Sequence, residues 1–564
     1  MERTQWYKNA IVYQIYPFSF MDSNNDGWGD IPGIISKLDY LKELGINAIW
    51  FSPLYKSPCF DYGYDIADYR DIDPKFGTLE DFRLLLNECH GRGIRVIMDM
   101  AINHSSVEHP WFKEAISSKE SKYRDYYIIR EGRRKGKKLL PPTNWNSTFT
   151  GSSWERIAGS DEFYLHLFCV EQPDLNWENP SLRQEAIDIF NYWLDMGVDG
   201  FRLDVFNMFS KVYPLRDGKK KIAGTGEEYY VDGPRMHEFL QLLNREAFSK
   251  HDCFTVGESY KPHPEDAYAY VKEENRELDT IFNFDHLASD NLFGAKYFPK
   301  PFSLKKFKSG LLGHQIANYN NRGWNTLVLE NHDCARSNSR FNINTCKYHY
   351  EASTFLPTVT FLGFGTPFIY MGEEFGMTNV DFKALDELKD PVSGFISKLL
   401  MSCGVPEKLA LHFMNFGARD HARVPMQWNK GINAGFNAGH APWQRMNGNY
   451  PQHNLESDLS SEKSVFRYYQ KLIALKKSDA FTYGSVKEHS HENRHVICFE
   501  REYQGDKFLV FGNFSGRSVK YTLPAEFRAC GETLLSNYAD RLERSGVCTL
   551  RPYEAVVLKL QAAE

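Results

Sequence analysis

Hydrophobic and polar positions along the chain define two kinds of segment in alternation. Short, almost continuously apolar runs recur, and each is followed by a stretch whose apolar residues fall at helical spacing. In the first such stretch Gly45 is the stop signal, and the residues of the apolar face are Ile35, Leu38, Leu41 and Leu44. Runs that are apolar on both faces are typical of buried parallel strands. The pattern therefore predicts repeated strand–helix units.

Eight such apolar runs occur, which is the number of strands in a (β/α)8 barrel. They are residues 10–17, 47–53, 93–100, 200–204, 253–258, 279–285, 325–333 and 367–374. We therefore predict the α/β class and a (β/α)8 TIM barrel. The barrel is expected in two parts, residues 1–104 and 175–480, with an excursion after strand 8 at about 376–450.

Two segments interrupt the alternation. Residues 105–174 are too long for a connector and predict a small inserted domain, domain B, after strand 3. Beyond about residue 480 the pattern changes to short strands with alternating polarity, which predicts a C-terminal antiparallel β-sandwich over residues 481–564. The basic stretches at 133–138 and 216–221 are interpreted as solvated loops.

Composition excludes several classes of protein. A formal net charge of −6 gives no support for nucleic-acid binding. No run of about 18 apolar residues predicts a membrane helix, and the N-terminus lacks the pattern of a signal peptide. The 10 cysteines are scattered without a C-x-x-C pair, which favours reduced thiols. We therefore expect a cytoplasmic protein whose partner is a small molecule.

Polar side chains gather where the predicted strands end. They are Asp99, Asn103 and His104 after strand 3, Arg202 and Asp204 at strand 4, Glu258 at strand 5, and His332 and Asp333 at strand 7. All strand C-termini of a parallel barrel open on one face, where the chemistry of this fold takes place. One such carboxylate could cap a helix, but the whole set at one rim indicates an active site.

Cleavage of a glycosidic bond requires such a set. One carboxylate must be ionised to attack the anomeric carbon, and a second must be protonated to donate to the leaving oxygen. Arg202 is expected to keep Asp204 ionised, because a nearby cation lowers a carboxylate pKa by about 1–3 units. Glu258 follows the apolar residues 254–256, where desolvation would raise its pKa toward that of an acid.

Six segments resemble motifs of the α-amylase family (glycoside hydrolase family 13). They are DMAINH (99–104), GFRLDV (200–205), FTVGES (254–259), LENHD (329–333), QPDLNW (172–177) and PFIYMGEEFGM (367–377). Further segments resemble the subgroup of oligo-1,6-glucosidases, dextran glucosidases and α-glucosidases. They are residues 16–46, DYGYDIADY (61–69), YLHLF (164–168), ARVPMQW (422–428) and NAGF (433–436).

The resemblance implies a role for each matching residue. Asp204 would be the nucleophile, Glu258 the acid/base and Asp333 the transition-state stabiliser. Asp61 and Arg419 would close the pocket and make the enzyme exo-acting, and Val205 would favour α-1,6 over α-1,4 linkages; the alternative is that Val205 only packs the barrel top. The other residues implied in substrate binding are Tyr64, His104, Phe149, Phe168, Gln172, Arg202 and His332. The implied substrate is a gluco-oligosaccharide, and catalysis needs no cofactor.

Three positions depart from the family's pattern. Phe18 stands where the family usually has arginine, and Ser259 and Cys334 replace the methionine and glutamine common on the leaving-group side. The implied function is a retaining exo-acting α-glucosidase, with trehalose-6-phosphate hydrolase and sucrose isomerase as alternatives. A catalytically inactive, glucosidase-like binding protein is the non-enzyme alternative, and the presence of all three carboxylates argues against it.

One acidic loop has the composition of a cation site. Oxygen ligands at alternate positions of a short loop suit a hard cation such as Ca²⁺, and relatives in the subgroup bind calcium here. The residues are Asp22, Asn24, Asp26, Trp28 and Asp30. A structural Ca²⁺ is therefore predicted, with a polar turn held by side-chain hydrogen bonds as the alternative.

Overall fold

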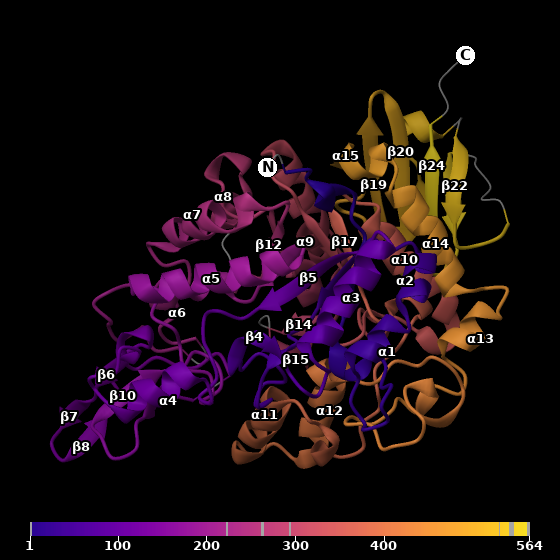
Figure 1. Cartoon of the computed structure of the whole chain (residues 1–564). Helices are drawn as coiled ribbons and strands as arrows, with labels where there is room; N and C mark the ends of the chain where they lie inside the picture. The colour runs from indigo at the N-terminus through magenta and orange to yellow at the C-terminus, as the bar shows by residue number, and fades with distance from the viewer. Residues whose placement is uncertain are drawn as a thin grey trace. The chain divides into compact units, whose positions relative to one another are not determined.

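The computed structural model describes residues 3–149, 151–221, 224–260, 264–292, 295–528, 531–540 and 546–560. The chain forms two compact units. Unit 1 contains Met1–Gln5, Trp50–Asn87 and Arg95–Ile281, and unit 2 contains Trp6–Ile49, Glu88–Ile94 and Phe282–Glu564. Figure 1 shows the arrangement of the helices and strands and labels many of them. Within the described residues, no helix is long and apolar enough to cross a membrane.

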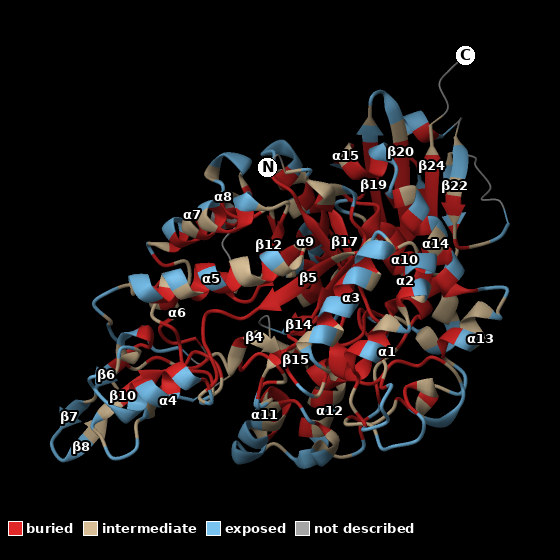
Figure 2. Ribbon diagram, in the orientation of Figure 1, coloured by how far each residue is buried: buried red, intermediate tan, exposed pale blue. Residues whose placement is uncertain are grey.

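The eight predicted barrel strands are confirmed. They are β1 (Val12–Ile15), β2 (Ala48–Phe51), β5 (Arg95–Met100), β11 (Gly200–Leu203), β12 (Phe254–Gly257), β13 (Thr280–Ile281), β16 (Thr326–Val328) and β17 (Thr366–Tyr370). They form one sheet in the order β13-β12-β11-β5-β2-β1-β17-β16, so each strand lies beside its neighbour in the (β/α)8 sequence. Every strand residue except Arg95 is buried, as the apolar runs require. In Figure 2 the labelled barrel strands β5, β12 and β17 are red.

The helix α5 (Pro180–Met196) illustrates how the local sequence sets the ends of these elements. The side chain of Asn179 accepts hydrogen bonds from the N–H groups of Ser181 and Leu182, and Pro180 occupies the first turn. The helix ends at Gly197, whose φ of 112° is left-handed. Its buried face packs on β11, with the rings of Phe190 and Phe201 4.9 Å apart.

The first predicted helix is divided in two. The structure has α1 (Ile31–Ile35) and α2 (Leu38–Leu44), separated by Lys37 at φ −111° and ψ 4°. The break changes the phase of the apolar face, so that Ile34 is buried in place of Ile35. Gly45 ends α2 at φ 102°, as predicted.

The segment after β5 belongs to unit 1 and contains a small antiparallel sheet. Its strands are β6 (Ile129–Glu131), β10 (Glu162–Leu165) and β9 (Trp154–Arg156), and β7 (Arg133–Lys135) forms a separate hairpin with β8 (Lys138–Leu140). Its apolar core includes Trp145, Phe163 and Phe168, and Val205 and Met208 belong to the same core. The segment therefore packs on the chain that follows β11.

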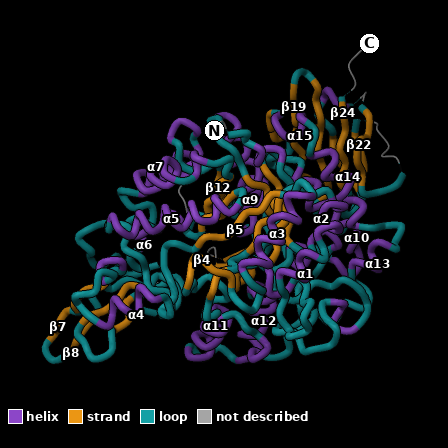
Figure 3. The backbone as a smooth tube through the Cα atoms, viewed as in Figure 1, coloured by secondary structure: helices purple, strands orange, loops and turns teal. Residues whose placement is uncertain are grey.

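The C-terminal part of unit 2 is antiparallel, as predicted. Its five-stranded sheet has the order β18 (Ser485–Glu488), β19 (Val496–Tyr503), β20 (Asp506–Asn513), β24 (Ala555–Lys559) and β22 (Glu532–Ser536). A second sheet pairs β21 (Val519–Thr522) with β23 (Val547–Leu550). Both sheets contribute to one apolar core that includes Phe511, Tyr521 and Leu550, as in a β-sandwich. Figure 3 shows β24 and β22 side by side.

Unit 2 also contains the excursion after β17 and several long helices. These helices are α9 (Leu304–Asn320), α10 (Thr345–Phe361), α11 (Pro391–Ser402), α12 (Glu407–Gly417) and α14 (Val465–Lys476). Within the excursion, α11 packs against α12, and α12 packs against β15 (Ala295–Pro299).

Candidate active site

One buried guanidinium connects three carboxylates in unit 1. Arg202 Nη1 donates to Asp99 Oδ1 at 2.6 Å and to Asp204 Oδ1 at 2.7 Å, and its Nη2 donates to Glu258 Oε2. Arg202 and Asp99 are register partners on the neighbouring strands β11 and β5, which brings their side chains together. The side chain of Arg202 is 2% exposed, and those of Asp204 and Glu258 are 10% and 18% exposed.

Two aromatic residues enclose this guanidinium. The guanidinium carbon of Arg202, Cζ, lies 5.4 Å from the ring centroid of Trp50 and 5.7 Å from that of Tyr64. Both side chains also donate hydrogen bonds to Asp99 Oδ2. Trp50 donates from Nε1 at 3.2 Å, and Tyr64 donates from its hydroxyl at 2.9 Å. Burial raises the pKa of Asp99 to about 6, against the lowering effect of Arg202. Burial acts to lower the pKa of Arg202, but the carboxylates around it hold that pKa well above its usual value.

A second group of polar side-chain contacts in unit 1 centres on Gln172. Its side-chain nitrogen lies 3.3 Å from Asp61 Oδ2 and 3.1 Å from His104 Nε2. Burial lowers the pKa of His104 to about 4, so the ring is neutral near pH 7. The ring of Phe168 lies 5.0 Å from that of His104 and 5.4 Å from that of Phe149. These contacts therefore place the neutral imidazole of His104 and the carboxylate of Asp61 beside an aromatic wall.

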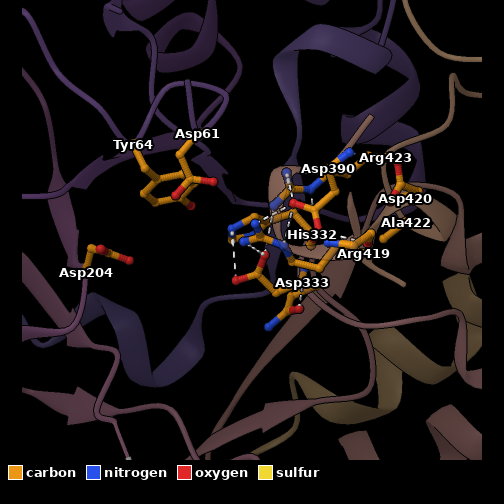
Figure 4. Close-up of polar contacts among 12 residues, drawn as sticks. Asp61, Tyr64, Asp204, His332, Asp333, Asp390, Arg419, Asp420, Ala422 and Arg423 are labelled. Atoms are coloured by element: carbon orange, nitrogen blue, oxygen red, sulfur yellow. Dashed lines mark hydrogen bonds and ion pairs between the residues drawn. The ribbon is translucent and has the colours of Figure 1, made fainter. Parts of the chain in front are cut away.

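The remaining predicted residues belong to unit 2, where two arginines hold Asp333. Arg419 Nη1 and Arg423 Nη2 donate to Asp333 Oδ1 at 3.1 and 2.9 Å, and His332 Nε2 lies 3.6 Å from Oδ2. Figure 4 shows these side chains converging on the Asp333 carboxylate. Burial alone would raise the pKa of Asp333, but the charges of His332, Arg419, Lys296 and Arg423 hold it well below its usual value. This carboxylate is therefore ionised across the neutral range.

Asp390 is a second carboxylate that forms ion pairs with the same two arginines. Arg419 Nε donates to Asp390 Oδ1 at 2.9 Å, and Arg423 Nη1 lies 3.7 Å from that oxygen. Burial acts to raise the pKa of Asp390, but the charges of Arg419 and Arg423 bring it to about 2. Asp390 therefore fixes both guanidinium groups that contact Asp333.

The predicted residues thus fall into two sets. Unit 1 contains Asp61, Tyr64, His104, Phe149, Phe168, Gln172, Arg202, Asp204, Val205 and Glu258. Unit 2 contains His332, Asp333 and Arg419. The pairing of Asp61 with Arg419 joins the two sets and stays a prediction.

The acidic loop is held by hydrogen bonds to its carboxylates. Asp22 accepts from the N–H groups of Asn25 and Gly27 at 2.6 and 2.8 Å, and Asp30 accepts from those of Ser23 and Gly33 at 2.8 and 2.6 Å. Asp22 and Asp30 are each 2% exposed. In the part of the chain that the structure describes, no three or more His, Cys, Asp or Glu side chains are grouped as a metal site. The cation itself stays a prediction.

Comparison with known proteins identifies the family. Residues 14–484 match the family described as alpha amylase, catalytic domain, and residues 496–557 match the alpha-amylase SusG C-terminal domain. The chain belongs to the α-amylase family. It is a glycoside hydrolase, as the sequence motifs predicted.

Relatives in this family match the chain from end to end. It is 45% identical to an oligo-1,6-glucosidase of Parageobacillus thermoglucosidasius, with 100% of both chains covered. Its structure is similar to that of trehalose-6-phosphate hydrolase from Bacillus licheniformis, with 42% identity, a TM-score of 0.93 and coverage of 99% and 100%. Isomaltulose synthase from Klebsiella sp. LX3 gives 38% identity, a TM-score of 0.94 and 99% coverage of both chains.

Sequence reasoning missed several residues of the site. Trp50 lies inside an apolar strand run, and nothing in the pattern marks its contact with Asp99. Arg423 lies within the ARVPMQW segment, which was used only as a mark of the subgroup. Asp390 directly precedes α11 and Lys296 lies in β15, both far from any motif, although the Lys296 ammonium donates to the Asp333 carbonyl at 3.0 Å. The environment of Glu258 also differs from the apolar one predicted, because Arg202 contacts its carboxylate.

Proposed function

We propose that the protein is a retaining, exo-acting α-glucosidase that releases α-glucose from the non-reducing end of α-1,6-linked gluco-oligosaccharides. The observation that carries the proposal is the contact of Arg202 with both Asp204 and Glu258. Two carboxyl groups brought together at the ends of neighbouring strands match the pair that a retaining glycosidase uses. The relatives named oligo-1,6-glucosidase, at 43–45% identity, support the substrate class.

In this proposal Asp204 is the nucleophile. Its carboxylate attacks the anomeric carbon and forms a covalent glucosyl ester, while Glu258 donates its proton to the leaving oxygen. The ionised Glu258 then accepts a proton from water, whose oxygen attacks the same carbon and releases Asp204. The charge of Arg202 stabilises the ionised form of Asp204, which is the form that attacks.

Asp333 is proposed to stabilise the positive charge that develops on the sugar ring. Its carboxylate is ionised because His332, Arg419, Lys296 and Arg423 surround it. A fixed anion placed where positive charge develops lowers the barrier without reorganising during the reaction. Asp390 supports this role by holding Arg419 and Arg423 in place.

The linked side chains of Asp61, Gln172 and His104 are proposed to bind the hydroxyl groups of the terminal glucose. A neutral His104 can donate from one ring nitrogen and accept at the other. The rings of Phe168 and Phe149 offer an apolar wall for the sugar. Asp61, paired with Arg419, is proposed to close the pocket beyond this glucose, so that only chain ends enter.

The preference for α-1,6 linkages is assigned to Val205, which directly follows Asp204. Its side chain belongs to the apolar core shared with Phe168 and Met208. A β-branched side chain is stiff at χ1 and narrows the space available to a directly attached ring. The additional methylene of a 1,6 linkage carries the second ring clear of this side chain.

One panel of substrates tests the function. The purified protein should hydrolyse isomaltose faster than maltose, sucrose, trehalose and trehalose 6-phosphate, and the product from longer chains should be glucose alone. Preferred hydrolysis of trehalose 6-phosphate, or conversion of sucrose into an isomer, would replace the proposal with one of the two alternatives. Inactivity on the entire panel would favour the non-catalytic alternative.

We further propose that the acidic loop holds one structural Ca²⁺. The buried carboxylates of Asp22 and Asp30 accept from N–H, hydroxyl and amide donors, and no ion pair of either carboxylate with a cationic side chain is found among the described residues. Uncompensated buried carboxylates favour a cation. Asn24, Asp26 and the Trp28 carbonyl would complete the oxygen ligands, and the ion would stabilise the loop without taking part in catalysis.

A further inference from the structure

The ladder between β11 and β12 continues past the ends of both strands with one extra residue. The last register pair is Leu203 with Gly257, so Asp204 and Glu258 come next. The Glu258 N–H donates to the Leu203 carbonyl at 2.8 Å, as in a regular parallel ladder. The Glu258 carbonyl, however, accepts from the N–H of Phe206 at 3.2 Å. A regular ladder would use the N–H of Val205, so Val205 is the extra residue, as in a β-bulge.

In this arrangement Val205 adopts an unfavourable backbone conformation. Its φ of 37° and ψ of 41° are left-handed, which a β-branched residue rarely adopts. Such a conformation is strained and persists only where the surrounding contacts impose it. The strain lies directly beside Asp204.

The side chain of Asn207 supplies the next contact between the two segments. Its Oδ1 accepts from the Tyr260 N–H at 2.8 Å, and its Nδ2 donates to the Tyr260 carbonyl at 3.0 Å. The amide thus pairs with both main-chain groups of Tyr260, as another strand residue would. Nδ2 also donates to Asp232 Oδ1 at 3.1 Å, and the Asp232 N–H donates to the Asn207 carbonyl at 2.8 Å. Asn207 is fully buried.

We infer that Asn207 is a positioning residue that sets the spacing between Asp204 and Glu258. It lies three residues after the first carboxylate and binds the residue two after the second. Its two-pronged pairing fixes both segments beyond the bulge and imposes the left-handed backbone of Val205. The inference rests on the proposed roles of Asp204 and Glu258.

Loss of the Asn207 pairing should change catalysis in a way that a loss of stability alone would not. Loss of the pairing lets Glu258 move relative to Asp204, and a displacement of about 1 Å can cost about 10²-fold in rate. General-acid catalysis matters most when the leaving group is a poor one, such as a sugar hydroxyl. An aryl α-glucoside with an acidic phenol, such as 2,4-dinitrophenyl α-glucoside, leaves without protonation. Loss of the Asn207 pairing should therefore lower kcat/KM more on isomaltose than on the aryl glucoside.

The experiment compares kcat/KM on isomaltose and on 2,4-dinitrophenyl α-glucoside for Asn207→Ala. We expect a loss of about 10²-fold on isomaltose and of less than about 10-fold on the aryl glucoside. The basic limb of the pH profile on isomaltose should also flatten, because activity falls there as the acid, Glu258, loses its proton. Asn207→Ser, which keeps a hydroxyl near the Tyr260 N–H, should give a smaller change of the same kind and serves if the alanine variant does not fold.

The matched control is Asn244→Ala. Asn244 is a buried asparagine on α7 (Met236–Glu246) whose side chain donates to the Glu277 carbonyl at 3.0 Å. The Asn244→Ala substitution should lower the melting temperature without changing the ratio of the two kcat/KM values. Equal losses on both substrates for the Asn207 variants, or an unchanged ratio, overturn the inference. The proposed function fails separately, if the unaltered protein does not hydrolyse isomaltose or Asp204→Asn keeps its activity.

Discussion

Arg202 and Asp204 lie two residues apart, and Arg202 Nη1 donates to Asp204 Oδ1 at 2.7 Å. Positions i and i+2 of an extended chain face the same side, so a strand end brings these side chains together without a loop. The same nitrogen also binds Asp99 on the neighbouring strand. The proposed nucleophile is therefore held by groups that belong to the sheet.

Retention of configuration is the first prediction. If Asp204 attacks the anomeric carbon, its carboxyl group should lie about 5–5.5 Å from that of Glu258, and the first sugar formed should be the α-anomer. Asp204→Asn should reduce kcat by at least about 10³-fold with the fold intact. Proton NMR of the early product checks the anomer, and circular dichroism checks the fold. Early β-glucose would assign the carboxylates to an inverting mechanism.

Linkage preference should depend on Val205. Steric discrimination in an apolar pocket amounts to about 10–200-fold, so kcat/KM should favour isomaltose over maltose by that margin. Val205→Ala removes the β-branch that narrows this space, and it should narrow the ratio. Measuring kcat/KM on both disaccharides for both proteins checks this. A better rate on maltose for the unaltered enzyme would refute the linkage assignment.

The free energy of unfolding should fall as the pH rises through the range in which Glu374 ionises. Burial raises the pKa of Glu374 to about 7, and its Oε1 accepts from the hydroxyls of Tyr13 and Tyr40. In the unfolded chain this pKa is about 4.3. Between these values the folded state binds more protons than the unfolded state, so the stabilisation present at low pH is lost on the way to pH 7.

Glu374→Gln tests this linkage because it keeps an acceptor and cannot ionise. The variant should show a flatter dependence of stability on pH and should be more stable than the unaltered protein at pH 8, by about 1–3 kcal/mol. Urea denaturation from pH 5 to 8 measures both. Glu120→Gln, at an exposed position, should leave the curve unchanged. Parallel curves for Glu374→Gln and the unaltered protein would contradict the prediction.

Removal of calcium should lower thermal stability. A ligand that binds only the folded state stabilises it by about 2.7 kcal/mol when present at 100 times its dissociation constant. Elemental analysis should find one calcium ion per chain, and chelation should lower the melting temperature without altering activity at low temperature. Asp26→Ala should abolish the effect of chelation. Unchanged melting with no metal found would leave the hydrogen-bonded turn as the sufficient description of residues 22–30.

Much of the fold followed from local patterns in the chain. Eight apolar runs predicted eight strands, because a strand that is buried on both faces excludes polar side chains. The end of α2 at Gly45 followed from the left-handed conformation that glycine tolerates. The strand-end positions of Asp204 and Glu258 were also readable, since they depend only on where each apolar run stops.

Other features depend on contacts between segments that are far apart in the sequence. The break between Ile35 and Leu38 changed which side chains are buried, although the apolar spacing predicted one helix. Trp50 and Asp390 carry no local signal, because their partners, Asp99 and Arg419, lie 49 and 29 residues away. Only packing brings such groups together.

The sequence by itself determined the order of the elements, the family and the carboxylates at the strand ends. The tertiary structure decided how those carboxylates are held: by one arginine shared among three of them, and by a left-handed Val205 between Asp204 and the Asn207 pairing. The physical reason is that hydrophobic periodicity is a property of neighbouring residues. The sharing of one cation and the strain at one residue are set by the surrounding strands, which must first come together.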